Sequence, residues 1–225
     1  MTRLYHFWSS PQSQRGRLAL GYKAAAWEDV PLDYDDDETF FELGIARQVP
    51  VLELDDGTLM TDSVDILERI DTLFPSGAPL REERIDDAAW QALLDWRRKV
   101  DEILERLYAP VRPAYRDVAG DDTTLAAYKT EVEQRFAMSL EALANDRYAG
   151  YEQLSRITRL PELARHLAHR QFYMGAISIA DMVLCSDLYP LQYLDGIALP
   201  IDLMYYLRRV TDACQVSPEE GLLSQ

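Results

Sequence analysis

The residues best suited to chemistry form a tetrapeptide, Ser-Pro-Gln-Ser, at positions 10–13. It lies between an apolar run at 4–8 and a helix-like segment at 14–23. If a strand ends here and the chain continues as a helix, the Ser10 hydroxyl lies at the helix N-terminus. Unpaired backbone N–H groups and the positive end of the helix dipole meet there, so a thiolate or another anion is favoured. A redox protein would place Cys-x-x-Cys at this point, whereas both sulfur positions of this chain are serine.

The elements that must position this hydroxyl are short and alternate between strand and helix up to about residue 74. The Asp-Asp-Gly turn at 55–57 predicts a β-hairpin, because Asp-Gly supplies the positive φ angles that tight hairpin turns require. The pattern predicts the order β-α-β-α-β-β-α, with a parallel crossover between the first two strands. The expected elements are strands at 4–8 and 27–32, helices at 16–22 and 40–43, hairpin strands at 49–54 and 58–60, and a helix at 63–74 that ends before Pro75.

Beyond residue 75 the pattern is helical throughout. Apolar residues recur at i, i+3 and i+4 from Trp90 to Tyr108, which predicts one long amphipathic helix. Ser178 and Asp181 have the spacing of a capping box, which starts a helix and needs no chemical role. Further helices are expected at 124–145, 161–172, 179–188 and 201–214. We therefore predict an α+β domain at 1–75, a linker at 76–83 and an all-α helical bundle at 84–225.

Composition narrows the function classes. Thirty-nine acidic and 23 basic residues give the 225-residue chain a net charge of −16, without a basic run that would bind nucleic acid or an anionic membrane. No stretch has the length and apolar character of a signal segment or a bilayer span. Cys185 and Cys214 are too far apart for a zinc motif, and the three histidines have no metal spacing. We expect a cytoplasmic protein without a metal, a nucleic-acid partner or a membrane partner.

Several short stretches in a fixed order together carry a family resemblance. They are the run at 10–13 with Arg15, Arg17, Gly21 and Lys23 behind it, Gln48-Val49-Pro50-Val51-Leu52, Asp62-Ser63, Asp65-Ile66, residues 96–100 and the start of the helix at 178–181. In this order the chain resembles the glutathione transferase (GST) superfamily, and within it the two-domain glutaredoxin 2 branch. The resemblance implies a thioredoxin-like first domain followed by the helical domain of the GST fold. It also implies that Ser10 and Ser13 stand where that branch has its two active-site cysteines.

The resemblance further implies a binding site for glutathione. The family holds the peptide bond before the proline equivalent to Pro50 in the cis form, which is common only before proline. The main chain of Val49 would then pair with the cysteinyl unit of glutathione, although Val-Pro can also simply begin a strand. Asp62 and Ser63 would bind the γ-glutamyl group, a role that is compatible with an ordinary helix N-cap. Glutathione is the ligand or substrate that these residues predict.

The chemistry then depends on Ser10. A serine hydroxyl cannot form the mixed disulfide of a glutaredoxin, so dithiol exchange is not expected. It can donate a hydrogen bond to the glutathione sulfur. A thiol of pKa ~8.5 is mostly ionised at neutral pH only if its pKa falls by about 1.5–2, which corresponds to roughly 2–3 kcal/mol. A helix N-terminus supplies up to ~2 kcal/mol and a charge-assisted hydrogen bond ~1.5–3 kcal/mol, so the two suffice. The alternative role of Ser10 is a plain N-cap.

Two functions of different class follow from the resemblance. The first is a serine-type glutathione S-transferase that joins the thiolate to a small hydrophobic electrophile. The second is a non-catalytic module, derived from a glutaredoxin, that senses glutathione or binds proteins. The sequence leaves open whether the chain is a monomer or a homodimer. Candidate residues for the electrophile site are Trp8, Gln12, Trp96, Tyr108 and Tyr115, although aromatic residues at helical spacing also build cores.

Overall fold

The computed structural model of the chain describes residues 1–223. Its first domain contains a four-stranded sheet with the strand order β2-β1-β3-β4. Strand β1 is parallel to β2 and antiparallel to β3, and β4 is antiparallel to β3. The predicted parallel crossover and the predicted hairpin are thus both confirmed. The strands are β1 (Thr2–His6), β2 (Trp27–Pro31), β3 (Val51–Glu53) and β4 (Leu59–Met60).

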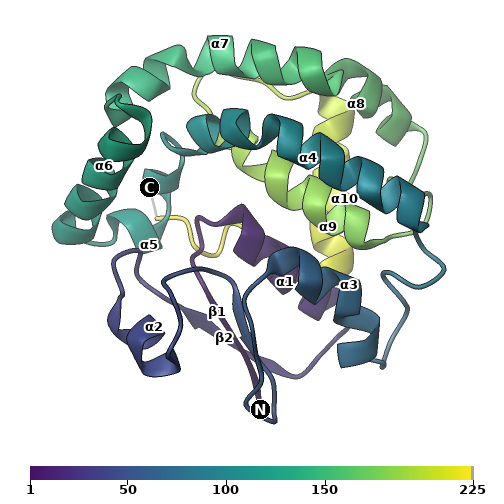
Figure 1. Cartoon of the computed structure of the whole chain (residues 1–225). Coiled ribbons are helices and arrows are strands. Elements are labelled where there is room, and N and C mark those ends of the chain that lie inside the picture. The colour runs from purple at the N-terminus through teal and green to yellow at the C-terminus, as the bar shows by residue number, and fades with distance from the viewer. Residues whose placement is uncertain (224–225) are drawn as a thin grey trace.

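The helices of this domain separate the sheet from the rest of the molecule. Helix α1 (Pro11–Tyr22) contacts β1 and α3 (Ser63–Leu73) within its own domain. It also packs against two helices from the second half of the chain, so it is the central element of the interface (Figure 1). The short helix α2 (Glu38–Leu43) lies apart from this layer, near the lower left of the view (Figure 1). The start of α1 is therefore close to side chains from both domains.

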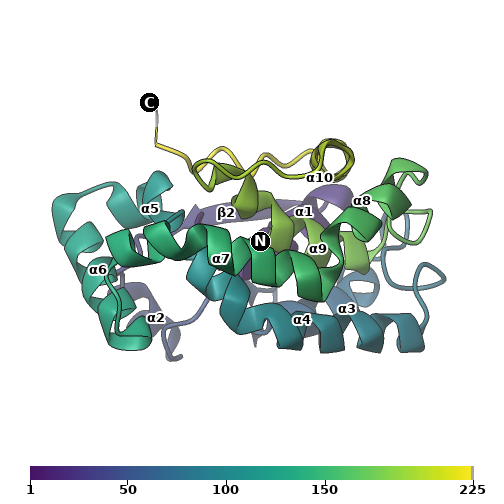
Figure 2. The same cartoon turned by 90° about the horizontal axis from the view of Figure 1, so that it is seen from above.

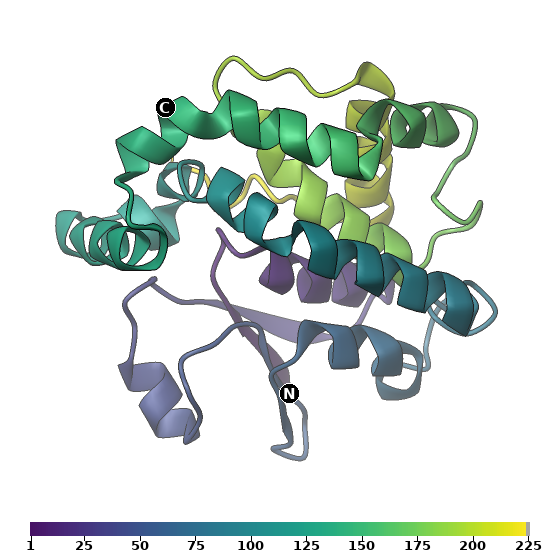
Figure 3. The ribbon, with the colours of Figure 1, turned by 45° about the horizontal axis from the view of Figure 1, so that its top comes forward.

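The second domain is a bundle of helices around a buried one. All ten residues of α9 (Ile179–Leu188) are buried, including the polar Asp181, Ser186 and Asp187. The predicted capping box of Ser178 and Asp181 is present at its start. The other helices are α4 (Asp87–Tyr108), α5 (Arg116–Ala119), α6 (Asp122–Phe136), α7 (Leu140–Thr158), α8 (Leu160–Ala168) and α10 (Ile201–Cys214), with 3-10 turns η1 (Arg112–Ala114) and η2 (Tyr189–Tyr193). Within this domain α9 contacts α4 and α10, and α7 packs against α4 and α8, as seen from two directions in Figures 2 and 3.

The predicted helix at 124–145 is wrong, because the chain forms two helices there. Ala137 ends α6 in the left-handed conformation, with φ of 52°. Ser139 then caps α7 by accepting a hydrogen bond from the Ala142 N–H at 3.2 Å. A single helix was predicted here because the residues on both sides of the break favour helix. Helix α7 also extends to Thr158, in a stretch where no helix was predicted.

Two irregular segments connect the domains. The predicted linker at 76–83 contains neither helix nor strand. The Asp71 carboxylate accepts hydrogen bonds from the main chain of Leu80, Arg81 and Glu82, which fixes the linker to the end of α3. At the other end of the chain, residues 215–223 return from α10 to the first domain.

The returning segment closes the domain interface from one side. The Arg116 N–H donates to the Gly221 carbonyl at 2.8 Å, and Arg17 of α1 pairs with Glu220 at 2.5 Å. None of the helices within residues 1–223 is both long enough and apolar enough to cross a bilayer.

Candidate functional site

Ser10 lies where the sequence predicts it, at the N-terminus of α1. Its backbone is extended, with φ of −91° and ψ of 115°, and its Oγ accepts a hydrogen bond from the Ser13 N–H at 3.2 Å. Pro11 takes the first helical position, where a missing N–H costs nothing. The predicted hydroxyl at a helix start is therefore confirmed. Its N-cap role uses an oxygen lone pair and a role toward a ligand would use the hydroxyl proton, so the two do not exclude each other.

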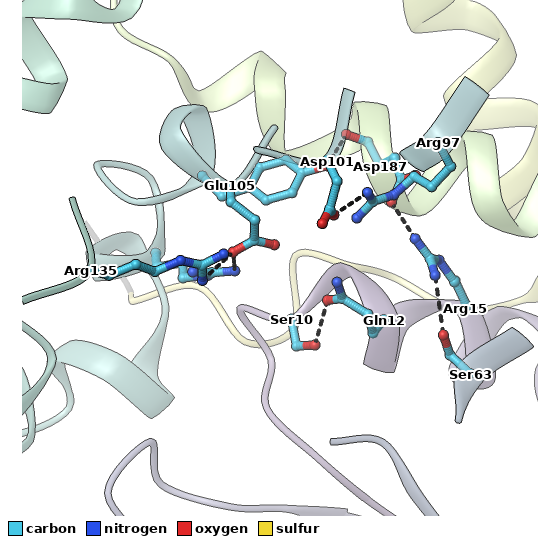
Figure 4. A network of polar contacts seen from close by, with 11 residues as sticks. Ser10, Gln12, Arg15, Ser63, Arg97, Asp101, Glu105, Arg135 and Asp187 are labelled. Carbon is cyan, nitrogen blue, oxygen red and sulfur yellow. Dashed lines mark hydrogen bonds and ion pairs between the residues drawn. The ribbon is translucent and has the colours of Figure 1, made fainter. Parts of the chain in front are cut away.

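The Ser10 proton has only a loose partner. The hydroxyl donates to the Gln12 side-chain oxygen at 3.3 Å, which is long for a hydrogen bond between oxygens. Ser10 is the N-cap of α1 and Gln12 belongs to its first turn, and Figure 4 shows the two side chains turned toward each other, below Asp101 and Glu105. A stronger acceptor, such as a sulfur anion, could replace Gln12 without any change of the backbone. Ser13 is fully buried, and its hydroxyl has no hydrogen-bond partner within residues 1–223.

A cleft of about 330 Å³ opens in front of Ser10, between the two domains. Its first wall comes from the first domain and includes Ser10, Gln12 and Val49. Its second wall comes from α4, η1 and α6 and is formed by charged side chains. These are Asp101, Glu105, Arg112 and Arg135, of which three are labelled across from Ser10 in Figure 4. The candidate site is this interdomain cleft.

Val49 contributes main chain to the first wall. The peptide bond between Val49 and Pro50 is cis, as the family resemblance implied. Pairing between β3 and β1 begins at Val51, and within residues 1–223 the N–H and C=O of Val49 make no main-chain hydrogen bond. A peptide-like ligand in the cleft would thus meet a free strand edge. Its pairing with glutathione stays a prediction.

Asp62 and Ser63 lie outside this cleft. The exposed Asp62 carboxylate caps α3 by accepting from the N–H groups of Val64 at 2.7 Å and Asp65 at 2.9 Å. Ser63 is buried, and its Oγ accepts a hydrogen bond from Arg15 at 3.1 Å. Figure 4 shows Ser63 on the side of Gln12 away from Ser10. A ligand would have to extend past Gln12 to reach both ends of the site.

A buried ion-pair network supports the cleft from behind. Asp187 of α9 is 0% exposed and receives Arg15 of α1 and Arg97 of α4, each at 2.7 Å. Arg97 also pairs with Asp101 on the second wall. The Tyr108 hydroxyl donates to the Asp187 carbonyl at 2.7 Å. Two domains and three helices thus meet at one carboxylate (Figure 4). This network could not be predicted from the sequence, because its partners lie far apart along the chain.

The charges of the second wall are largely neutralised in pairs. Glu105 is 5% exposed and contacts Arg112 at 2.9 Å and Arg135 at 3.2 Å. Burial alone would raise the pKa of Glu105, but these two guanidinium groups outweigh it and hold the pKa below its usual value. Glu105 is therefore an anion at neutral pH, and the wall presents fixed charges of both signs. The sequence predicted α4 as an amphipathic helix but assigned no role to these charges.

A second serine lies beside Ser10 and was also missed. The Ser9 N–H and Oγ both donate to the Asp117 carboxylate, at 3.1 Å and 2.6 Å. Burial raises the pKa of Asp117, and the two hydrogen bonds from Ser9 oppose that rise. Because Ser9 gives its proton to Asp117, it is not free to donate toward the cleft. Its contacts instead tie the end of β1 to α5, which fixes the backbone before Ser10.

The structure does not bring the predicted aromatic residues into this cleft. Trp8 is buried beneath the C-terminal segment, where a side chain added at Gly221 would contact its ring. Tyr108 and Tyr115 are buried in the core. Trp96 lines a separate hollow between α4 and α8. Among these candidates only Gln12 lines the cleft, and the role of each residue toward a substrate stays a prediction.

Residues 1–223 contain no group of three or more His, Cys, Asp or Glu side chains arranged to hold a metal ion. Cys185 and Cys214 are both buried and form no disulfide. Burial raises the pKa of both thiols, so neither is a reactive thiolate at neutral pH.

Sequence comparison relates the first domain to a described family. Residues 4–79 match the model of the glutathione S-transferase N-terminal domain. Glutaredoxin 2 of Escherichia coli strain K12 is 31% identical over 136 residues, which cover 60% of this chain and 59% of that protein. The match thus spans about three fifths of the relative's length.

Solved structures extend the likeness to both domains. Glutaredoxin 2 from Salmonella typhimurium, solved in complex with glutathione, superposes with a TM-score of 0.78 at 20% identity and 96% coverage of each chain. A glutathione S-transferase of Ceriporiopsis subvermispora, also in complex with glutathione, gives 0.70 at 18% identity, covering 96% of this chain and 98% of its own. These likenesses confirm the predicted fold, a thioredoxin-like domain followed by a helical one.

Proposed function

We propose that this protein is a member of the glutathione transferase superfamily, similar to its glutaredoxin 2 branch, and that it binds glutathione in the interdomain cleft. The free main chain of Val49 would pair with the cysteinyl unit, as a strand edge pairs with an extended peptide. The γ-glutamyl end would extend past Gln12 to the start of α3, where Ser63 retains a donor and Asp62 an exposed carboxylate.

We further propose that the protein is a serine-type glutathione S-transferase. The Ser10 hydroxyl turns from Gln12 to the glutathione sulfur, and the N-terminus of α1 favours the negative charge that develops there. The thiol proton leaves to water. The thiolate then forms a bond to an electrophilic carbon, and the leaving group departs with the bonding electron pair. The observation that carries this proposal is the position of Ser10, at once the N-cap of α1 and part of the cleft wall.

The test is the ionisation of bound glutathione. Calorimetry measures binding, and the ultraviolet absorption of the thiolate, followed against pH, gives the pKa of the bound thiol. We expect Ser10→Ala to raise that pKa by about 1–2, the equivalent of a charge-assisted hydrogen bond. Ser13→Ala is the matched control, because its buried hydroxyl has no partner to lose within residues 1–223. An unchanged thiol pKa in Ser10→Ala would contradict the transferase mechanism.

A non-catalytic glutathione-binding module is the second candidate. It is favoured by one observation, namely that the Ser10 hydroxyl already has partners within the chain for both its proton and its oxygen. In that case glutathione would bind as a neutral thiol, with no thiolate absorption at pH 7 and no effect of Ser10→Ala on conjugation. Dithiol reduction of disulfides is expected to be absent under both candidates, because neither Ser10 nor Ser13 carries sulfur.

A further inference from the structure

The second wall of the cleft is unsuited to an apolar molecule. Four of its side chains carry full charges: Asp101, Glu105, Arg112 and Arg135. An apolar electrophile placed against them would remove water from these groups and return no hydrogen bond. Glu105 and Arg112 form the interior of the wall, where their side chains are 7% and 13% exposed and satisfy each other. This wall therefore offers no apolar surface to the hydrophobic electrophile expected from the sequence.

The two outer charges of the wall remain available to a ligand. The Asp101 side chain is 55% exposed although it pairs with Arg97, and the Arg135 side chain is 53% exposed although it contacts Glu105. A carboxylate has two oxygens and a guanidinium five N–H donors, so each group retains capacity beyond its present partner. Figure 4 shows Glu105 between Asp101 and Arg135, so the wall offers an anion and a cation on opposite sides of a neutralised centre.

We propose that the second substrate is a zwitterion, an electrophile of the amino-acid or small-peptide class. Its ammonium group pairs with Asp101 and its carboxylate with Arg135. The inference rests on the proposed function, because it assigns the first wall to glutathione and the second wall to the other substrate. The two pairs hold the electrophilic carbon over the sulfur at Ser10. A sulfur–carbon bond forms there, the bond from carbon to its leaving group breaks, and the leaving group takes the electron pair.

Two probes of similar size separate the charged from the neutral class. 3-Chloroalanine is a zwitterion and 2-chloroacetamide is neutral; in both, the thiolate displaces chloride from carbon. The measured quantity is the ratio of their kcat/KM values, each corrected for the uncatalysed reaction with glutathione. We expect Asp101→Asn and Arg135→Gln each to lower this ratio about 3- to 10-fold, as expected for one partly exposed charged contact.

Two controls accompany these variants. Asp95→Asn is the matched control, since Asp95 lies on α4 like Asp101 and pairs with the exposed Arg98. It should leave the ratio unchanged. The second control is a calorimetric titration of glutathione into each variant, which shows whether the altered charges contact glutathione itself. We expect the Kd of glutathione to stay within about twofold of the wild-type value.

Each outcome of these measurements supports or overturns the proposal of a zwitterionic second substrate. A fall of the ratio in both variants, with unchanged glutathione affinity, supports the zwitterionic substrate. An unchanged ratio overturns it, and so does a loss of glutathione affinity, which would assign the charged wall to glutathione. If the wild type forms the thiolate but turns over only the neutral probe, this inference fails while the proposed function stands. If glutathione does not bind at all, the proposed function fails and this inference fails with it.

Discussion

Replacement of Asp187 by asparagine removes the charge on which the domain interface depends. The carboxylate is fully buried and receives Arg15 and Arg97 at 2.7 Å each. An asparagine side chain keeps one oxygen, but its amide group turns N–H donors toward the second guanidinium. Both arginines are themselves nearly buried. The substitution thus leaves two buried cations with one neutral acceptor between them.

The magnitude follows from what each arginine retains. Removing one partner of a buried ion pair costs about 3–5 kcal/mol. Arg15 keeps its hydrogen bond to Ser63, and Arg97 keeps Asp101. We therefore expect the lower part of that range, a loss of about 3 kcal/mol in the free energy of unfolding. Because domains are stable by only about 5–15 kcal/mol, the variant should still fold.

Urea unfolding followed by circular dichroism measures this loss. Asp95→Asn is the control on the same interface helix α4, because its pair with Arg98 is exposed and should change stability by less than about 0.5 kcal/mol. A second variant replaces Arg15, Arg97 and Asp187 by Met, Met and Leu, and should recover much of the loss, since apolar groups can replace a buried ion network. A loss below about 1 kcal/mol in Asp187→Asn would refute the assignment of this network as the link between the domains.

Two further predictions concern backbone strain and pH. Ala137→Gly should raise the free energy of unfolding by about 0.5–1 kcal/mol, because the left-handed φ of 52° favours glycine; Ala126→Gly, inside the regular part of α6, should lower it by about the same amount in the same urea titration. Glu105 has a folded-state pKa below its unfolded value, so it contributes stability above the unfolded pKa of about 4.3 that is lost as the pH falls. The stability difference between wild type and Glu105→Gln, measured from pH 7 to pH 3, should therefore shrink as the pH falls; a constant difference would contradict the ion pairing.

Local signals were sufficient for most of the fold. The hairpin at 55–57 and the capping box of α9 each depend on a few neighbouring residues, and both are present. The division of 124–145 into two helices was missed, because the break depends on a left-handed Ala137 rather than on a glycine or proline. Alanine favours helix, so its local preference indicates the opposite of what tertiary packing imposes there.

The candidate site also has parts that could be predicted from the sequence and parts that could not. The N-cap position of Ser10 and the cis peptide before Pro50 were accessible, because each is a property of a short stretch. The charged wall could not be predicted from the sequence. Asp101 and Glu105 are four residues apart, which is the spacing of residues on the solvent-exposed face of an amphipathic helix. Only the packing of the helical domain turns that face toward the first domain. Helical periodicity cannot distinguish a face that meets water from one that lines a cleft.

The two walls of the cleft are built in different ways. The first wall of the cleft combines main-chain geometry, a helix start and a strand edge, with the Ser10 hydroxyl at the helix start. The second wall is built from side-chain charges held by long-range pairs, with Arg97 joining Asp101 to the buried Asp187. A change of side chain on α4 can therefore alter the second substrate without disturbing the wall that we assign to glutathione. Under the proposed function, the first wall would hold the thiol of glutathione and the charged wall would select the molecule that approaches it.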